Sequence, residues 1–368
     1  MKRGENIYLR KDGRWEGRYI KGRTVSGRAV FGSVYGKSYK AVKAKLLPLK
    51  LAHTTPVGGR YSGLFSGWLR CWLEGQSGKV KESTQACYHR QMTLHILPAL
   101  GDIPLQKLSA QTIQDFVNQL ANKGLAPSTV NGIFRIVSAA VQKAADEFII
   151  PVNVCAKIEL PKGRIMEVEA LTRTEQEQLE TVAAQDKNGL AALLSLYTGM
   201  RVGEISALRW EDVDLENGLI QVRRTAQRIS LQRNKETKTS VIFGPPKSAS
   251  SMRLIPLPQT MTDCLKKHRE TAVSEYVITS RRGFAEPRVL QYRLQSLIKK
   301  AGITPTRFHA LRHSYATRCI ELHIDITTLS KNLGHASTKM TFDVYTHASL
   351  EHRKEAVQDL NTLYQNIG

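Results

Sequence analysis

The chain has 368 residues, 41% apolar and 23% charged; this length suggests two or three domains of about 150 residues, and this composition excludes wholesale disorder. No apolar run approaches the roughly 18 residues that would span a bilayer, and no secretory leader opens the chain, so we expect a soluble, cytoplasmic protein. The 54 Lys and Arg against 32 Asp and Glu give a net charge of +22, which attracts polyanions: nucleic acid, anionic membrane or acidic protein.

Residues 7–50 predict a small antiparallel sheet followed by a helix. Apolar residues alternate on both sides of Asp12-Gly13, a favoured hairpin turn, a third strand spans 29–35, and a helical pattern over 38–47 ends before Pro48. Residues 1–50 hold 14 Lys and Arg and three acids, half of the net charge. Such a face can simply be solvated, but basic residues between aromatic ones favour contact with DNA. The candidates are Arg10, Lys11, Arg14, Arg18, Lys21 and Arg23.

Residues 52–63 are rich in Gly and predict a linker, and the next hundred residues predict a four-helix unit. Helices are expected at 64–73, at 82–97 up to Pro98, after the cap Ser109, and from Pro127. Trp68 and Trp72 lie four positions apart, and we expect them in the core rather than stacked on bases. Nothing in this stretch resembles an active site.

A second linker, 157–169, precedes a mixed region. The expected helices are 175–184, 191–196, 201–208 and those from about residue 289 to the end, and the expected strands are 219–229 and 241–255. The second strand contains Pro245-Pro246, which favours an edge or irregular strand. The five cysteines (Cys71, Cys87, Cys155, Cys264 and Cys319) form no close pair, which argues against disulfides and C-x-x-C zinc modules and favours a reducing compartment.

The C-terminal half holds the residues that could carry chemistry. They are Arg201, Glu204, Lys247, His309, Arg312, His335 and Tyr345. Each has an ordinary structural interpretation when taken alone, such as a salt bridge for Arg201 or packing for Tyr345. As a group they allow two hypotheses, a metal site and an anion site.

The metal hypothesis rests on His309 and His313, which lie four positions apart on one face of a predicted helix. The general-base Glu of an H-E-x-x-H motif is absent, because Ala310 stands in its place. Arg312 would also lie beside a divalent cation, which is electrostatically costly. We therefore expect no metal.

The anion hypothesis uses Arg201, Lys247 and Arg312 as cations, with His309 and His335 as hydrogen-bond donors. Guanidiniums grip a phosphate through paired N–H donors, as a metal-free phosphoryl transfer requires. A tyrosine nucleophile with a pKa near 10 costs about 4 kcal/mol to ionise at pH 7. Charge-assisted hydrogen bonds of about 1.5–3 kcal/mol each could offset that cost in a cationic pocket.

The C-terminal half resembles the tyrosine recombinases, specifically the integrases of phages and integrative elements. Four segments carry the resemblance in the family's order: TGMRVGEISALRWEDVD (198–214), PPKSASSMRLIPLP (245–258), HALRHSYAT (309–317) and LGHASTKMTFDVYTH (333–347). More loosely, the helical stretch resembles the core-site-binding domain of this family, and the basic sheet resembles its arm-type-site-binding domain. The implied domains are 1–55, 62–160 and 170–368.

The resemblance implies that Tyr345 attacks a DNA phosphodiester, giving a 3′-phosphotyrosyl link and a free 5′-hydroxyl. Arg201 and Arg312 correspond to the arginines that hold the non-bridging oxygens. Because the phosphotyrosyl bond conserves the energy of the broken phosphodiester, the implied reaction needs neither metal nor ATP, and no cofactor is expected.

The remaining site residues are implied in the same way. Lys247 falls where the family has its β-hairpin lysine, the acid for the 5′-oxygen leaving group. Several other basic residues lie near Lys247 in the sequence. The Ser-x-x-Ser-x-Arg pattern that follows Lys247 favours it over them for this position. His309 matches the general acid/base position, His335 the donor to the scissile phosphate, and Glu204 an acidic position that orients the site. Arg253 could contact the DNA backbone or pair with an acid.

One spacing departs from part of the family. His335 and Tyr345 are ten positions apart, whereas the branch that resolves chromosome dimers typically has nine. The longer spacing resembles that of mobile-element integrases. The tail at 351–367 has an apolar stripe, which could pack in cis or dock on a neighbouring protomer, as the family does.

The sequence therefore predicts a site-specific DNA recombinase of a mobile element, a phage or a conjugative transposon. Its implied DNA partner is double-stranded DNA with core-type and arm-type sites. Its implied protein partners are three further protomers, in a tetramer that acts through a four-way junction, and an excision-helper or DNA-bending protein. No membrane partner is expected. The alternatives are an inactive integrase-derived regulator and a relaxing enzyme similar to type IB topoisomerases. The expected fold is multidomain: a small basic three-stranded sheet with a helix, a helical domain, and a mainly α domain with a β-hairpin and small sheet.

Overall fold

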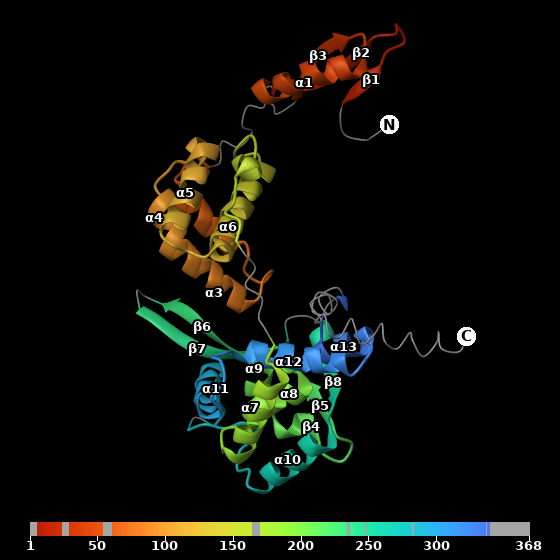
Figure 1. Ribbon diagram of the computed structural model, residues 1–368. Helices are drawn as coiled ribbons and strands as arrows, with labels where there is room; N and C mark the ends of the chain where they lie inside the picture. The colour runs from red at the N-terminus through yellow and green to blue at the C-terminus, as the bar shows by residue number, and fades with distance from the viewer. Residues whose placement is uncertain are drawn as a thin grey trace, which may run out of the picture. The chain divides into compact units, whose positions relative to one another are not determined.

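The computed structural model describes residues 6–23, 29–53, 61–163, 170–233, 236–246, 249–281, 283–335 and 337–338. The chain divides into two compact units, Met1–Arg164 and Ile165–Gly368 (Figure 1). In these described ranges no helix combines the length and apolar character needed to cross a membrane.

The first unit begins with the predicted antiparallel sheet. Its strands are β1 (Ile7–Leu9), β2 (Trp15–Arg23) and β3 (Ala29–Gly36), in the order β1-β2-β3. The β1–β2 turn places Gly13 at φ +80°, which a glycine adopts without strain. Helix α1 (Tyr39–His53) packs on one face through Val42 and Leu46. It continues past Pro48, where the sequence predicted its end.

Helix α1 approaches the sheet closely because Gly17 has no side chain. A Cβ atom at Gly17 would lie 2.7 Å from Val42 Cγ1 and 3.1 Å from Leu46 Cδ2. The neighbouring Glu16 is buried on β2 and receives hydrogen bonds from Arg10, Arg18 and Ser33 at 2.9 Å each. These bonds, the Arg18 bond first, lower the pKa of Glu16 to about 2 against the opposing effect of desolvation.

The described residues 61–163 of the first unit are mainly helical, as predicted. Its elements are α2 (Phe65–Glu74), α3 (Glu82–Gln91), η1 (Met92–Ile96), α4 (Leu97–Leu100), η2 (Leu105–Lys107), α5 (Ala110–Asn122), α6 (Pro127–Asp146) and η3 (Val154–Lys157). Ser109 caps α5 by accepting a hydrogen bond from the Thr112 N–H. Trp68 and Trp72 are buried, which confirms their prediction as core residues. Pro98 does not end a helix, because it lies in the first turn of α4, where no N–H is needed.

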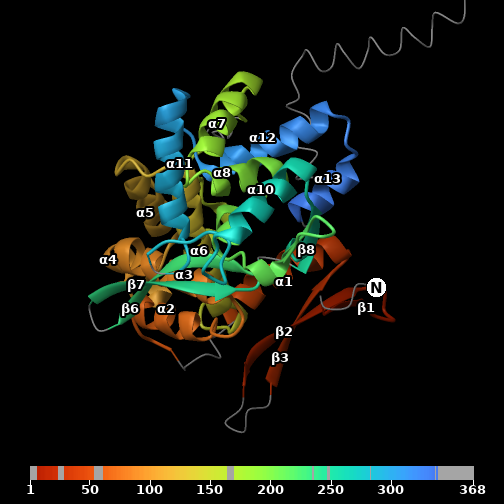
Figure 2. The ribbon, with the colours of Figure 1, turned by 90° about the horizontal axis from the view of Figure 1, so that it is seen from below.

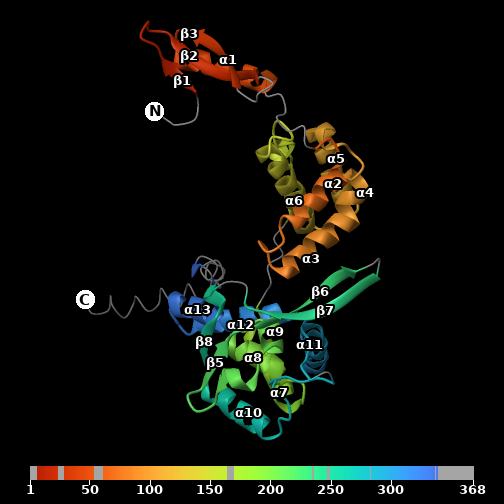
Figure 3. The ribbon, with the colours of Figure 1, turned by 180° about the vertical axis from the view of Figure 1, so that it is seen from behind.

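The second unit is built around the buried helix α8 (Figure 3). The helices are α7 (Arg173–Gln185), α8 (Leu190–Thr198), α9 (Val202–Ser206), α10 (Gln259–Glu270), α11 (Pro287–Ala301), α12 (Phe308–Glu321) and α13 (Ile326–Leu333), with short turns η4 (Trp210–Asp212) and η5 (Ala249–Ser251). Helix α10 was missed by the sequence prediction, because only three of its residues are buried and its apolar stripe is short.

The strands of this unit form two separate sheets. Strands β4 (Val213–Asp214), β5 (Leu219–Val222) and β8 (Arg253–Pro256) make one sheet. Strands β6 (Thr225–Arg233) and β7 (Glu236–Gly244) make an antiparallel ribbon that extends past α11 of the same unit (Figure 1 and Figure 2). Each of the two predicted long strands is therefore two strands with different partners. Pro245 and Pro246 follow β7 and lie outside any strand.

Candidate active site

Arg312 lies at the centre of the candidate site and is buried, with 4% of its surface exposed. It projects from α12, and its two terminal nitrogens donate hydrogen bonds to the carbonyl oxygens of Gly199 and Leu333, each at 2.7 Å. Gly199 follows α8 and Leu333 is the last residue of α13. Carbonyls at helix C-termini lack partners within the helix and carry partial negative charge. Two helix ends therefore hold Arg312 without a carboxylate.

Both helix ends depend on a glycine with positive φ. Gly199 has φ +64° and Gly334, which caps α13, has φ +65°. A Cβ atom at Gly199 would lie 2.6 Å from Tyr315 Cδ1 and 2.7 Å from Leu333 Cδ2. The glycines of the Thr-Gly and Leu-Gly pairs thus allow the carbonyls to face Arg312.

Arg201 forms a second part of the site together with Glu204. It precedes α9, and its Nη1 donates to Glu204 Oε1 at 2.9 Å while its backbone N–H donates to Oε2 at 3.0 Å. Arg201 remains 35% exposed, whereas Glu204 is 3% exposed. Arg253 also pairs with Glu204, with distances of 3.2 Å from Nη1 to Oε1 and 3.0 Å from Nη2 to Oε2. The two alternatives for Arg253 are thereby resolved in favour of an acidic partner.

Glu204 is ionised although it is buried. Desolvation opposes ionisation, but the hydrogen bonds and charge of Arg253, followed by those of Arg201, outweigh it and lower the pKa of the carboxyl below its ordinary value. Arg312 adds a third cation, whose pKa burial and Arg201 lower to about 9. In the described part of the chain, Arg201 and Arg253 pair with the Glu204 carboxylate while Arg312 is bonded to carbonyl oxygens, so this cluster keeps a positive surplus.

His309 and His335 lie within the field of these cations. His309 is in the first turn of α12, and His335 follows the α13 cap, where its backbone N–H donates to the Ser330 carbonyl at 3.1 Å. Desolvation lowers the pKa of both imidazoles to about 4; His313 is the next cause for His309, and Arg312 for His335, and Arg201 contributes to both. At pH 7 both rings are therefore neutral, each with one N–H donor and one acceptor nitrogen.

His313 lies one helical turn beyond His309. The two rings are 4.7 Å apart between centroids and nearly perpendicular, and desolvation followed by Arg312 lowers the pKa of His313. In the parts of the chain that the structure describes, no three His, Cys, Asp or Glu side chains are grouped so as to hold a metal.

The structure thus brings together Arg201, Glu204, His309, Arg312 and His335. Lys247 and Tyr345 lie outside the described residues, as does the tail at 351–367. Sequence analysis missed the Gly199 and Leu333 carbonyls, because a backbone contact leaves no side-chain pattern.

The basic candidates of the N-terminal sheet are partly engaged with neighbours. Arg10, Lys11, Arg14 and Arg18 are exposed. Arg10 and Arg14 lie 5.6 and 5.7 Å from the Tyr35 ring centroid, and Arg18 lies 5.3 Å from that of Tyr8. Lys21 and Arg23 belong to β2, but their side chains are outside the description.

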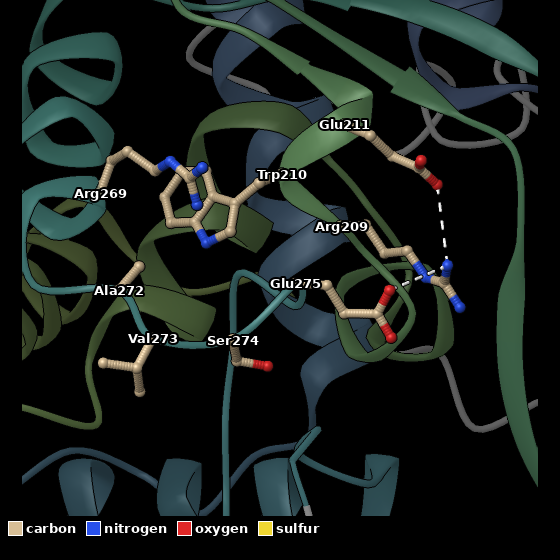
Figure 4. Close-up of a pocket in the computed structure, with 8 residues that line it drawn as sticks. All are labelled: Arg209, Trp210, Glu211, Arg269, Ala272, Val273, Ser274 and Glu275. Carbon is tan, nitrogen blue, oxygen red and sulfur yellow. Dashed lines mark ion pairs between the residues drawn. The ribbon is translucent and has the colours of Figure 1, made fainter.

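A separate pocket lies between the segment after α9 and the end of α10 (Figure 4). It is lined by Arg209, Trp210, Glu211, Arg269, Ala272, Val273, Ser274 and Glu275. Arg209 pairs with Glu275 at 3.1 Å and lies 3.8 Å from Glu211. These acids neutralise it, and none of the site residues from the sequence analysis lines the pocket, so the pocket is not the anion site.

Known protein families match parts of both units of the chain. The Phage integrase family matches residues 166–352, and the SAM-like N-terminal domain of phage integrases matches residues 64–121. The tyrosine recombinase XerC-like protein of Caldanaerobacter subterraneus subsp. tengcongensis is 27% identical over 93% of this chain and 94% of its own. The ICEBs1 integrase of Bacillus subtilis is 26% identical over 70% of this chain and 72% of its own.

Solved structures show the same fold. The Tn1549 transposon integrase, bound to a circular intermediate DNA, has a TM-score of 0.68 and 20% identity and covers 81% of this chain and 100% of its own. A lambda integrase tetramer bound to a Holliday junction has a TM-score of 0.59 and 21% identity over 92% of this chain and 97% of its own.

These matches define the class of protein as an enzyme that breaks and rejoins DNA at specific sites through a tyrosine. Since the family match spans more than half of its residues, the chain belongs to the phage integrase family. The predicted fold class and the predicted function, a site-specific recombinase of a mobile element, are confirmed.

Proposed function

We propose that the cluster around Arg312 binds the scissile phosphate of a DNA recombination site and that Tyr345 is the nucleophile. The observation that carries this proposal is the charge balance among the described residues: Arg201 and Arg253 both pair with the carboxylate of Glu204, and Arg312 is bonded to two carbonyl oxygens. A phosphodiester carries one negative charge and gains a second in the pentacoordinate transition state. The cationic surplus matches that gain.

The two phosphate-binding arginines have different roles in this proposal. Arg201 is partly exposed and fixed by Glu204, so its remaining N–H groups can bind one non-bridging oxygen. Arg312 uses one hydrogen of each terminal nitrogen on a carbonyl, which leaves three of its five donors for the phosphate. Charge-assisted hydrogen bonds of about 1.5–3 kcal/mol each would offset the roughly 4 kcal/mol cost of the phenolate.

Proton transfer falls to the imidazoles and to Lys247. Because desolvation and the neighbouring cations keep His309 neutral, its free nitrogen can accept the Tyr345 proton as the phenol attacks. Neutral His335 donates a hydrogen bond to the phosphate. Lys247 protonates the 5′-oxygen as the P–O bond breaks, and the tyrosine oxygen stays bonded to the 3′-phosphate.

The test is capture of the covalent adduct. Protein is incubated with a nicked duplex that spans the junction of its mobile element, and the mixture is denatured and separated by electrophoresis. Tyr345→Phe should abolish the adduct and leave DNA binding unchanged. Tyr292→Phe, which changes an exposed tyrosine of α11, is the matched control and should retain it. An adduct that survives Tyr345→Phe refutes the assignment of the nucleophile.

The domain roles form a second part of the proposal: residues 1–55 bind arm-type sites, 62–160 bind core sites, and 170–368 catalyse. The exposed arginines of the N-terminal sheet support the arm role. Deleting 1–55 should reduce the salt dependence of binding to arm DNA, because fewer counterions are released. The truncated protein should still cleave an isolated core site, and loss of that cleavage would contradict the division of roles.

Assembly is the third part. We infer that four protomers act on two DNA sites in the cytoplasm through a four-way junction, with the tail at 351–367 docked on a neighbouring protomer and an excision-helper or DNA-bending protein setting direction. The lambda integrase tetramer on a Holliday junction supports this stoichiometry. Sedimentation of the protein with a synthetic four-way junction should give four protomers per junction, and deletion of 351–368 should reduce that number.

A further inference from the structure

Arg253 is a buried arginine whose hydrogen bonds join three parts of the second unit. It begins β8, and its side chain is 5% exposed. Its Nη1 and Nη2 donate to the two oxygens of Glu204, Nη1 also donates to the Ser251 carbonyl at 3.0 Å, and Nε donates to the Asn332 carbonyl at 2.5 Å. Four of the five guanidinium donors therefore have protein partners.

Two of these partners, Glu204 and Asn332, lead to residues of the proposed phosphate site. Glu204 holds the Arg201 side chain at 2.9 Å and its backbone N–H at 3.0 Å. Asn332 lies three positions before His335, in the last turn of α13. A single guanidinium thus links the α9 segment that carries Arg201 to the α13 end that carries His335.

Gly334 makes this link possible. A Cβ atom at Gly334 would lie 2.9 Å from Arg253 Cδ and 3.1 Å from its Nη1. The α13 cap therefore rests directly against the arginine side chain. Ser251 reinforces the contact from the Arg253 side, since its hydroxyl donates to the Gly334 carbonyl at 3.4 Å.

We propose that Arg253 is a positioning residue for DNA cleavage, which fixes Arg201 through Glu204 and His335 through the Asn332 carbonyl. This inference rests on the proposed function of Arg201 and His335. Charge alone does not account for the arrangement: a lysine could pair with Glu204, but its single ammonium lacks the planar fork that spans the carboxylate and the carbonyl. Arg253→Lys therefore keeps the positive charge but removes the bridge between Glu204 and the Asn332 carbonyl.

The matched control is Arg318 on α12. It also joins a carboxylate to a carbonyl, because Nη1 donates to Glu321 Oε2 at 2.7 Å and Nη2 donates to the Leu171 carbonyl at 2.8 Å. It lies in the same unit and is 20% exposed. Arg318→Lys breaks a bridge of the same chemistry that leads to no residue of the proposed site.

The experiment measures the single-turnover rate of adduct formation on the nicked junction duplex, together with the Kd for the same DNA. Arg253→Lys should lower the rate constant by about 10- to 100-fold, since a displacement of about 1 Å at a reacting group has effects of that order. Its Kd should stay within about threefold. Arg318→Lys should change neither value. A rate for Arg253→Lys equal to that of Arg318→Lys would overturn the proposal.

A second measurement tests whether Arg253 acts through Glu204. In a Glu204→Gln background, Arg253→Lys should cost a smaller factor in rate than in the wild type, because part of its action passes through the Glu204 carboxylate. Independent, multiplicative effects would refute that route. Tyr345→Phe is run in parallel: if it retains the adduct, the proposed function fails, whereas an inactive Tyr345→Phe with a fully active Arg253→Lys refutes only the positioning role.

Discussion

Replacing Gly199 with alanine tests whether the carbonyl that holds Arg312 depends on glycine. The substitution has two costs. A non-glycine residue at φ +64° loses about 1–2 kcal/mol to left-handed strain. The new Cβ atom would also lie 2.6 Å from Tyr315 Cδ1 and 2.7 Å from Leu333 Cδ2, and overpacking of this kind costs about 1–3 kcal/mol. The expected loss is about 2–5 kcal/mol in the free energy of unfolding of the second unit.

Gly302 provides the control, because it caps α11 at φ +68° and a Cβ atom there would meet nothing within 4 Å. Gly302→Ala should show the strain alone, about 1–2 kcal/mol. Hydrogen exchange of peptides from α8 and α12 in increasing urea measures both variants in the full chain. Gly199→Ala should also slow adduct formation per folded molecule, since its carbonyl moves relative to Arg312. Equal destabilisation of the two variants, with normal cleavage by both, would refute the reasoning.

Three further outcomes are expected. Ser314→Ala should destabilise the second unit by about 1–3 kcal/mol, because the buried hydroxyl accepts the Leu171 N–H at 2.8 Å; urea unfolding measures it, and an unchanged midpoint would contradict it. Folding lowers the pKa of His335 from 6.5 to about 4. Below pH 6.5 the unfolded chain therefore binds a proton that the folded chain does not, and the free energy of unfolding falls by up to about 1.4 kcal/mol per pH unit as the pH approaches 4. A His335→Gln variant should lose less stability over that window. Glu204→Gln leaves Arg253 buried without its counter-ion, at a cost of about 3–5 kcal/mol; added DNA should raise the Tm of this variant more than that of the wild type, and an equal shift would exclude electrostatic compensation by phosphate.

The fold was predictable where apolar periodicity decides it. The helices of the first unit have wide apolar stripes, and their burial matches the predicted spacing. The strands of the second unit were not separable, because side chains alternate in the same way through β5 and β6 while the chain changes its partner from β8 to β7. Arg224, which stands between these two strands, pairs with Glu211 at 2.7 Å. A local pattern carries no information on such a change of partner.

The candidate site was predictable only in part, for a similar reason. The motif residues around Arg312 were found through their resemblance to a family, since each alone is an ordinary polar residue. Arg253 stayed ambiguous because its partner Glu204 is 49 positions away, and only the folded chain brings the two together. The carbonyl contacts do leave one trace in the sequence, which is the pair of glycines Gly199 and Gly334. Each glycine ends a helix and so indicates where helix-end carbonyls lack partners within the helix.

The contrast between the two buried arginines explains how the site keeps its charge. Arg253 pairs with a carboxylate that it shares with Arg201, which suits a residue that links segments. Arg312 is held by two carbonyls, which fix its orientation through partial charges and leave its full positive charge in place. A carboxylate in either carbonyl's position would hold the guanidinium as firmly but would repel the phosphate. Carbonyl contacts at helix ends are therefore the arrangement that lets a buried arginine be both rigid and available to an anion.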